Sequence, residues 1–214
     1  MSQQPPKPEV PSRRGVRSPD GTRERIVLQT RKTIAEAGLR SVKARDIARR
    51  AGVSVGTIYN MFGPLDNLVR MSNAVTYDDL FEHQSAALSA ARADGAEPGD
   101  TLRRLARAYL DWVRTHHALW SATLAFNRER RDDDVPEWYS SRERALLGII
   151  EDALSDFPHE WDGEMRLHTA RALWASIHGI VAMAMGATAL LLPVDELELQ
   201  MDVIIGPVAA GLMG

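Results

Sequence analysis

Residues 41–62 read SVKARDIARRAGVSVGTIYNMF, and this stretch decides how the N-terminal part of the chain folds. Its pattern predicts two short helices joined by a tight turn. We expect Ser41 to cap the first helix, because a serine hydroxyl accepts a hydrogen bond from a free N–H of the first turn. That helix should end at Gly52, since glycine tolerates left-handed backbone. Ser54 then stands where it can cap the second helix.

The second short helix has one apolar side and leaves small and polar residues on its other faces. Ile58 and Phe62 are four residues apart and therefore share the side that we expect to be buried. A short helix of this kind suits the major groove of DNA. The alternative is a helical hairpin that serves another purpose, and the pattern by itself favours neither interpretation.

A longer stretch connects this pattern to a family. Residues 23–68, with the core D-I-A-x-x-A-G-V-S-x-G-T-I-Y-x-x-F, resemble the N-terminal domain of the TetR family of transcriptional regulators. Residues 174–179, WASIHG, resemble a W-x-x-x-H-G motif in the C-terminal domain of one subset of that family. The resemblance implies an all-α chain, with an N-terminal three-helix helix-turn-helix domain followed by a larger helical ligand-binding and dimerisation domain.

We divide the chain into three parts on this basis. Residues 1–19 are rich in proline and polar residues and predict a disordered basic arm. The arm either contacts DNA or carries its charge incidentally, and the second interpretation is favoured. Residues 20–64 are the expected helix-turn-helix DNA-binding domain, and residues 65–214 the expected ligand-binding and dimerisation domain. Met61 and Leu65 stand where the family often has His and Lys, so neither is assigned to DNA.

The charge of the chain is unevenly distributed. The net charge is −3, which alone argues against a nucleic-acid partner. Residues 1–60, however, hold 13 Lys or Arg and 5 Asp or Glu, for a charge of +8, and residues 61–214 carry −11. A basic end on an acidic body is typical of a small DNA-binding module attached to a larger domain.

Several function classes lack their sequence signals. The 214 residues contain no cysteine, which fits a reducing cytoplasm. The N-terminal residues also lack the apolar run that a secretory signal peptide requires. No nucleotide-binding glycine loop, nucleophile motif or metal motif is present. We therefore expect no cofactor, no metal and no enzymatic activity, and a cytoplasmic location.

The body should be helical throughout. Apolar periodicity predicts helices over residues 22–37, 64–93, 101–116, 118–126, 138–157 and 172–192, and a last helix that reaches about residue 205. Residues 172–192 contain no charged side chain and are long enough to span a bilayer, but their Ala and Gly content favours a buried or paired helix. Asp195 and Glu198 resemble a capping box, and Gly206 and Pro207 should kink or interrupt the last helix.

Three sets of candidate site residues follow. For DNA they are Ser41, Lys43, Arg45, Ser54, Val55, Gly56, Thr57, Tyr59 and Asn60. For an apolar ligand with a few polar contacts they are Tyr77, Phe81, Trp112, His116, Trp120, Phe126, Trp174, His178 and Met183. For the dimer interface they are Ala175, Gly179, Ala182, Gly186, Ala189, Met201 and Ile205, because small residues allow close helix contact and because the resemblance implies that the last two helices pair in a four-helix bundle.

The resulting hypothesis is a homodimeric, sequence-specific repressor that binds a palindromic operator in double-stranded DNA and is released by a small apolar ligand. Thr57 and Asn60 are expected to contact base edges, Val55 a thymine methyl group, and Tyr59, Lys43 and Arg45 phosphates. The alternative is a helical protein-interaction scaffold without sequence-specific DNA binding. The charge distribution argues against that alternative.

Overall fold

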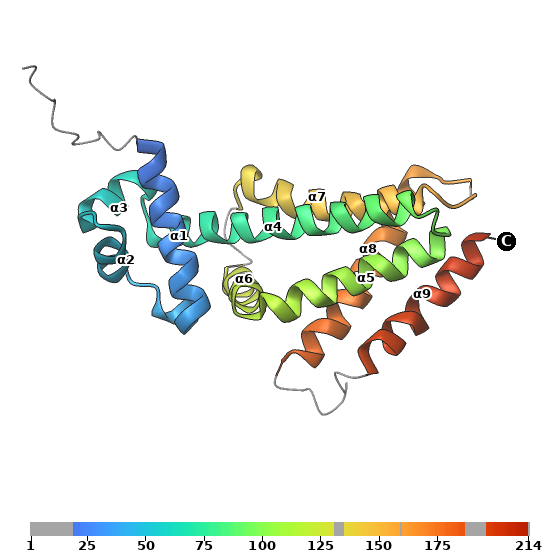
Figure 1. Ribbon diagram of the computed structural model, residues 1–214. Coiled ribbons are helices and arrows are strands. Elements are labelled where there is room, and N and C mark those ends of the chain that lie inside the picture. Colours follow the sequence, from blue (N-terminus) through green and yellow to red (C-terminus); the bar gives the residue numbers. More distant parts are fainter. Residues whose placement is uncertain (1–18, 131–134, 159, 187–195, 214) are drawn as a thin grey trace, which may run out of the picture.

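The computed structural model describes residues 19–130, 135–158, 160–186 and 196–213, and within these ranges all regular structure is helical. The elements are α1 (Pro19–Ala37), η1 (Leu39–Ser41), α2 (Ala44–Ala51), α3 (Val55–Phe62), α4 (Leu65–Ala93), α5 (Pro98–Thr115), α6 (His117–Glu129), α7 (Glu137–Leu154), α8 (Gly163–Ala184) and α9 (Leu197–Met213). Helices α1 to α3 form a head at one end of an elongated molecule, and the remaining helices form the body (Figure 1). The predicted all-α class is confirmed.

The turn between α2 and α3 is built as the sequence predicts. Gly52 adopts left-handed backbone, with φ 65° and ψ 41°, and closes α2. The Ser54 hydroxyl accepts a hydrogen bond from the N–H of Thr57 at 3.1 Å and caps α3. Ile58 and Phe62 are buried, so the predicted apolar side of α3 does face the core of the head.

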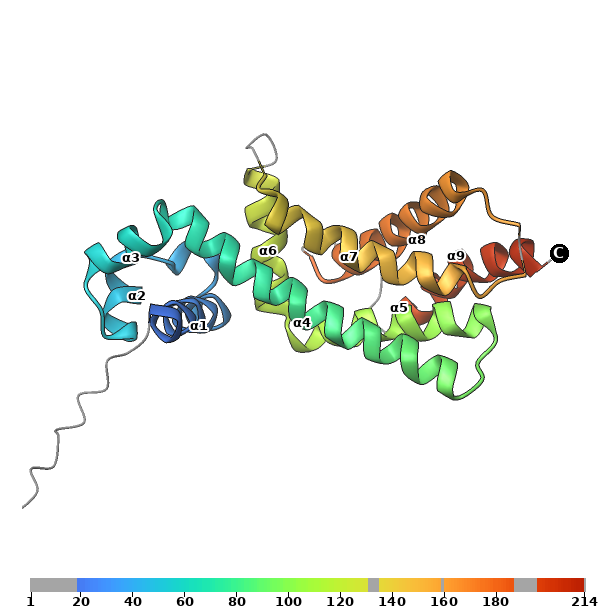
Figure 2. The same cartoon turned by 90° about the horizontal axis from the view of Figure 1, so that it is seen from above.

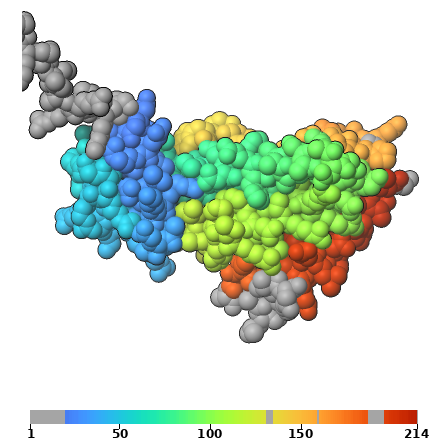
Figure 3. All heavy atoms as spheres, viewed as in Figure 1, coloured from blue at the N-terminus to red at the C-terminus, as the bar shows by residue number. Residues whose placement is uncertain are grey.

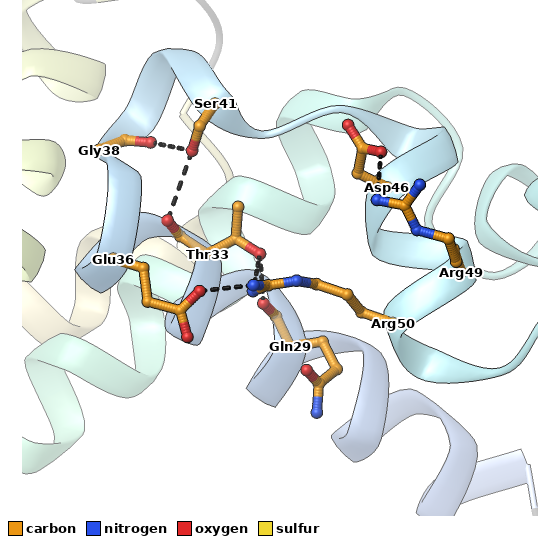
Figure 4. Close-up of polar contacts among 8 residues, drawn as sticks. All are labelled: Gln29, Thr33, Glu36, Gly38, Ser41, Asp46, Arg49 and Arg50. Carbon is orange, nitrogen blue, oxygen red and sulfur yellow. Dashed lines mark hydrogen bonds and ion pairs between the residues drawn. The ribbon is translucent and has the colours of Figure 1, made fainter.

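The cap predicted at Ser41 is wrong. Ser41 lies at the end of η1, and α2 begins three residues later, at Ala44, without a side-chain cap. The Ser41 hydroxyl instead donates a hydrogen bond to the carbonyl oxygen of Gly38 at 2.6 Å (Figure 4). Gly38 has a positive φ of 77°, which turns the chain sharply after α1. This turn directs the serine back toward α1 rather than toward the start of α2.

The long helix α4 connects head and body, and its predicted span is confirmed. Seen from above, its first turns lie beside the head and the rest runs along the body (Figure 2), where it packs against both α5 and α7. Helices α8 and α9 pack against each other, and α9 also packs against α5. The largest core cluster joins residues from α4, α5, α7, α8 and α9.

The C-terminal helices depart from prediction at their ends. Helix α8 begins at Gly163, nine residues before the predicted start, because the Asp162 carboxylate caps it by accepting from the N–H of Glu164 at 2.9 Å. Asp195 lies outside the described residues, so the predicted capping box stays a prediction. Helix α9 continues through Pro207, and the predicted interruption is wrong.

The continuation of α9 has a packing reason. Its buried side, with Met201, Ile205 and Ala209, spans both sides of the proline. An internal proline costs about 3 kcal/mol, but beyond it Ala209 is buried and Val208 and Leu212 pack partly buried against the core, which offsets part of that cost. Keeping the helix intact preserves that burial.

Within the described residues, no helix is sufficiently long and apolar to cross a membrane.

The two hydrophobic clusters do not divide at residue 64. The cluster that forms the core of the head also includes Leu68 and Val69 from α4 and Ala122 and Phe126 from α6. In the space-filling view the head is a lobe whose contact with the body runs through these segments (Figure 3). The boundary between residues 64 and 65 stays a prediction, but the packing of the head extends beyond it.

Two glycines in the helix-turn-helix should respond oppositely to alanine. Gly52→Ala forces a side chain into left-handed backbone and should lower the free energy of unfolding by about 1 kcal/mol. Gly56 is helical, and an added Cβ would meet only the Ser54 hydroxyl at 3.6 Å, so Gly56→Ala should raise that free energy by up to about 1 kcal/mol. Urea unfolding of both variants measures the difference, and equal destabilisation would contradict the assignment.

Candidate nucleic-acid interface and ligand cavity

Helix α3 presents short side chains to solvent on the side opposite its buried residues. Gly56, Tyr59 and Asn60 are exposed, and Val55 and Thr57 are partly buried. Ile58 and Phe62 fix this orientation, because they are buried in the head. All five proposed DNA-contact positions in α3 therefore remain at least partly accessible.

The cations of the head fall into two groups. Lys43 and Arg45 are exposed, and no partner among the described residues is found for either. Arg49 instead pairs with Asp46 at 3.0 Å, and Arg50 is held on α1 by Glu36 at 2.5 Å (Figure 4). The first group is available to phosphates without breaking an internal ion pair.

Two serines of the candidate set have internal roles instead. The Ser41 hydroxyl is bonded to Gly38, and the Ser54 hydroxyl caps α3 and lies 2.9 Å from the Thr57 hydroxyl. In that hydroxyl pair one oxygen donates to the other, so one hydroxyl proton stays available to an outside acceptor. We therefore remove the side chain of Ser41 from the candidate DNA contacts, and Ser54 acts by positioning Thr57.

A cavity of about 230 Å³ lies in the body, between α4, α5, α6, α7 and α8. Six ring-bearing residues line it: Tyr77, Tyr109, Trp112, Trp120, Trp174 and His178. The polar side chains in the lining are Thr76, Thr123, Asn127 and Glu143. A second, apolar space of about 50 Å³ shares the walls formed by Tyr109, Leu146 and Trp174, and extends to Ile205 of α9.

The structure brings five of the nine predicted ligand residues together: Tyr77, Trp112, Trp120, Trp174 and His178. The other four are not in this cavity, and their assignment is corrected. Phe126 is buried in the core of the head, and His116 stacks on Trp112 at the end of α5 with a ring separation of 4.7 Å. Phe81 and Met183 are exposed at the surface. Helix periodicity does not distinguish these positions, because the cavity is bounded by five different helices.

Sequence analysis missed three residues that give the cavity its polar character. Tyr109 looks like a core residue, Asn127 lies at the end of a predicted helix, and Glu143 has the periodicity of a solvent-exposed position. No local signal distinguishes them from ordinary core or surface residues. Their convergence depends on how α5, α6 and α7 pack.

Hydrogen bonds orient both ends of the cavity. The Trp120 indole N–H donates to the Tyr109 hydroxyl at 2.9 Å, and that hydroxyl lies 2.7 Å from Nδ1 of His178. If the tyrosine proton is donated onward, Nδ1 accepts and the neutral imidazole carries its proton on Nε2. Burial lowers the pKa of His178 and raises that of Tyr109, so both groups are held in their neutral forms.

At the other end, four groups form one chain of hydrogen bonds. Tyr139 donates to the side-chain oxygen of Asn127 at 2.8 Å, and the Asn127 amide donates to the Tyr77 hydroxyl at 2.8 Å. The Tyr77 hydroxyl donates to the Glu143 carboxylate. Burial, together with the nearby tyrosine and glutamate, raises the pKa of Tyr77. The chain therefore ends on a carboxylate that stays an acceptor.

The predicted dimer residues separate into two groups. Ala175 is exposed on α8 and Gly179 and Ala182 are partly exposed on it, Gly186 is exposed in the turn just after α8, and Ala189 lies outside the described residues. Met201 and Ile205 are corrected, because both are buried in the core of the subunit and cannot reach a partner. The most exposed large apolar residues of α9 are Leu199 and Val203, with exposed fractions of 66% and 64%.

The family now follows from comparison with known proteins. Residues 26–70 match the family described as bacterial regulatory proteins, tetR family, and residues 102–202 match the tetracyclin repressor-like C-terminal domain. Both halves of the resemblance therefore agree. The chain belongs to the TetR family of transcriptional regulators. Among the described residues of this TetR-family protein, no group of His, Cys, Asp and Glu is arranged to hold a metal ion.

This TetR-family protein is similar to curated relatives in sequence and to solved structures in fold. It is 31% identical over 104 residues to the HTH-type transcriptional regulator BetI of Paraburkholderia xenovorans, a match that covers 49% of this chain and 52% of BetI. The chain thus spans about half the length of the curated relatives it matches. A transcriptional regulator from Rhodococcus sp. RHA1 has a TM-score of 0.66 at 22% identity, covering 90% of this chain and 98% of that one. FadR of Bacillus subtilis, solved with stearoyl-CoA, has a TM-score of 0.55 at 16% identity, covering 88% of this chain and 98% of that one.

The lowered pKa of His178 gives the folded protein a defined pH dependence. A histidine in the unfolded chain has a pKa of about 6.5, so the contribution of neutral, buried His178 to the free energy of unfolding is complete above that pH. It is lost as the pH falls, because the unfolded chain takes up the proton first. We expect the free energy of unfolding to decrease between about pH 7 and about pH 5. The decrease should be smaller in His178→Gln, and an identical decrease in both proteins would contradict the pKa assignment.

Proposed function

We propose that this chain is a ligand-responsive repressor that binds a palindromic operator as a homodimer and is released by a small, largely apolar ligand. The observation that carries the proposal is the exposed side of α3, which presents Gly56, Thr57 and Asn60 in a head whose exposed cations include Lys43 and Arg45 at the start of α2. Family membership supports the same assignment. In a two-fold dimer the half-sites would lie about 34 Å, or a multiple of that, apart.

Gly56 supports direct contact between α3 and DNA. A Cβ at this position would meet the Ser54 hydroxyl at 3.6 Å, an ordinary contact, so packing within the head does not require glycine. Glycine also weakens a helix relative to alanine. A residue that costs helix stability and that the fold does not need is accounted for if the DNA backbone or a base comes close to α3 at this point.

Base and phosphate contacts can be assigned on this face. We assign Thr57 and Asn60 to base edges, because both are polar and lie three residues apart on α3. Val55 is placed for a thymine methyl group. Tyr59, which is 50% exposed, and the free cations Lys43 and Arg45 are assigned to phosphates.

Helix α6 supplies the route by which a ligand would affect the head. Trp120, Thr123 and Asn127 line the cavity, whereas Ala122 and Phe126 pack in the core of the head. A ligand that displaces α6 would therefore change the packing of the head directly. The shift is limited to the difference in the ligand's affinity for the two arrangements.

The homodimer is proposed to form through α8 and α9. Ala175, Gly179 and Ala182 form a strip of small residues on α8, and Leu199 and Val203 add exposed apolar surface on α9. Small residues allow two helices to approach closely, and exposed apolar side chains gain free energy when a partner buries them. Pairing of these faces around a two-fold axis would place two heads on one DNA duplex.

The stearoyl-CoA of the FadR structure is not carried over to this chain. In the part of the chain that the structure describes, the cavity lining contains neither Lys nor Arg to meet the phosphates of coenzyme A. A volume of about 230 Å³ suits a smaller molecule.

Two substitutions should separate base reading from phosphate binding. Thr57→Ala should weaken binding to the operator about tenfold or more and leave binding to random DNA nearly unchanged. Lys43→Ala should weaken binding to both and reduce the salt dependence by about one unit of slope. Gel shifts at several salt concentrations, with the promoter DNA next to the protein's own gene and a random duplex, measure both effects.

The gel shifts also test the proposal as a whole. If Thr57→Ala loses equal affinity for the operator and for random DNA, the base-reading assignment fails. If the unchanged protein gives no shift even at low salt, the helix-turn-helix does not bind this DNA and the repressor proposal fails with it.

The dimer face has its own test. Gly179→Leu should shift the protein from dimer to monomer in analytical ultracentrifugation, because the larger side chain separates the paired helices. An added Cβ at Gly179 meets nothing within 4 Å in the subunit, so the variant should fold. Leu28→Asp, at an exposed leucine on α1, is the matched control and should stay dimeric. Two equally dimeric variants would place the interface elsewhere.

A further inference from the structure

Among the described residues that line the cavity, Glu143 is the only acidic or basic one apart from the neutral His178. It comes from α7 and is exposed, so its carboxylate lies where the cavity opens to solvent. The cavity therefore carries a negative charge at its opening. No lysine or arginine of the described ranges lines it to offset that charge.

The neighbouring arginines are committed to other carboxylates. Arg142 pairs with Asp78 at 2.8 Å, and Arg144 pairs with Glu137. Within the described part of the chain, no ion pair to Glu143 is found. A carboxylate without a cation has unused acceptor capacity, because its oxygens offer about four lone-pair sites.

The hydrogen-bond chain from Tyr139 holds this carboxylate in place. Tyr77 donates to Oε1 of Glu143, and Asn127 lies 3.3 Å from the same oxygen. Both donors are directed at Oε1 of Glu143, and no contact from a described residue is found for its second oxygen, Oε2. The arrangement thus orients Glu143 and leaves an acceptor for a ligand that can donate.

The walls of the cavity favour the same kind of ligand. The faces of Tyr and Trp rings attract cations, and five such rings line the cavity. Tyr109 and Trp174 also border the apolar space beyond, which can receive an apolar group. Electron-rich rings around a carboxylate attract an organic cation and repel an anion.

We propose that the ligand of this cavity is an organic amine, bound as its ammonium ion. The ammonium group donates to Glu143 and lies against the aromatic rings, and the apolar body extends past Tyr109 and Trp174 toward the apolar space. The inference rests on the proposed function only in taking this cavity as the ligand site. It adds a positive charge to the ligand, which the proposed function describes only as small and largely apolar.

Three probes with one aromatic body and different charges test the inference on the full-length protein. They are 2-phenylethylamine, 2-phenylethanol and phenylacetate, added near neutral pH, where an alkyl amine is protonated and a carboxylic acid is ionised. Three of the five tryptophans line the cavity, so quenching of tryptophan fluorescence reports binding, and calorimetry confirms it. The amine should bind about tenfold tighter than the alcohol, and phenylacetate should bind most weakly.

Glu143→Gln removes the charge and keeps the size and the hydrogen bond from Tyr77. It should weaken binding of the amine about tenfold and leave binding of the alcohol unchanged. Glu137→Gln, on the same helix but outside the cavity, is the matched control and should leave both unchanged. Equal affinities for the three probes, binding of none of them, or an equal loss for amine and alcohol in Glu143→Gln would overturn the inference.

A gel shift with the same probes separates this inference from the proposed function. If the amine binds through Glu143 but does not release DNA, the ligand class is supported and the repressor mechanism fails. If phenylacetate binds and releases DNA while the amine does neither, the ligand class is overturned and the repressor mechanism is supported.

Discussion

The packing of Phe126 between head and body is the contact on which the rest of the structure depends. Its side chain is 2% exposed and belongs to the core of the head, although α6 is otherwise part of the body. Arg130 lies over its ring at 4.5 Å and pairs with Asp66 in the first turn of α4 at 2.8 Å. Full burial of an aromatic side chain contributes about 1.5–3 kcal/mol, so α6 cannot move without a cost in the head. Phe126 thus joins the two parts of the molecule together with Leu68, Val69 and Ala122.

Some of the charged side chains of the head form internal ion pairs, and others stay exposed. Arg31 pairs with Asp79 on α4, and Arg50 pairs with Glu36 on α1. These ion pairs orient α1 against its neighbours. Lys43 and Arg45 carry the charge that remains available at the surface near α3. The charge of +8 counted over residues 1–60 therefore overstates what a DNA duplex would meet in the described part of the head.

The cavity combines polar groups that are costly to bury with partners that satisfy them. Tyr109 bridges Trp120 and His178, and Asn127 bridges Tyr77 and Tyr139. A buried polar group without a partner would cost about 1–3 kcal/mol, and these chains avoid that cost. The chains also fix the positions of Glu143 and His178 before any ligand enters. A site held in advance loses less entropy on binding.

The sequence by itself determined the all-α class, the helix-turn-helix with its Gly52 turn and Ser54 cap, and the span of α4. These features depend on contacts within a few residues, which periodicity and capping express directly. Only the tertiary structure decided that Tyr109, Asn127 and Glu143 meet at one cavity, that Phe126 belongs to the head, and that Leu199 rather than Met201 is exposed. Residues with the same local sequence pattern can face different neighbouring helices. Which helices pack together depends on contacts between positions far apart in the chain, which local periodicity does not encode.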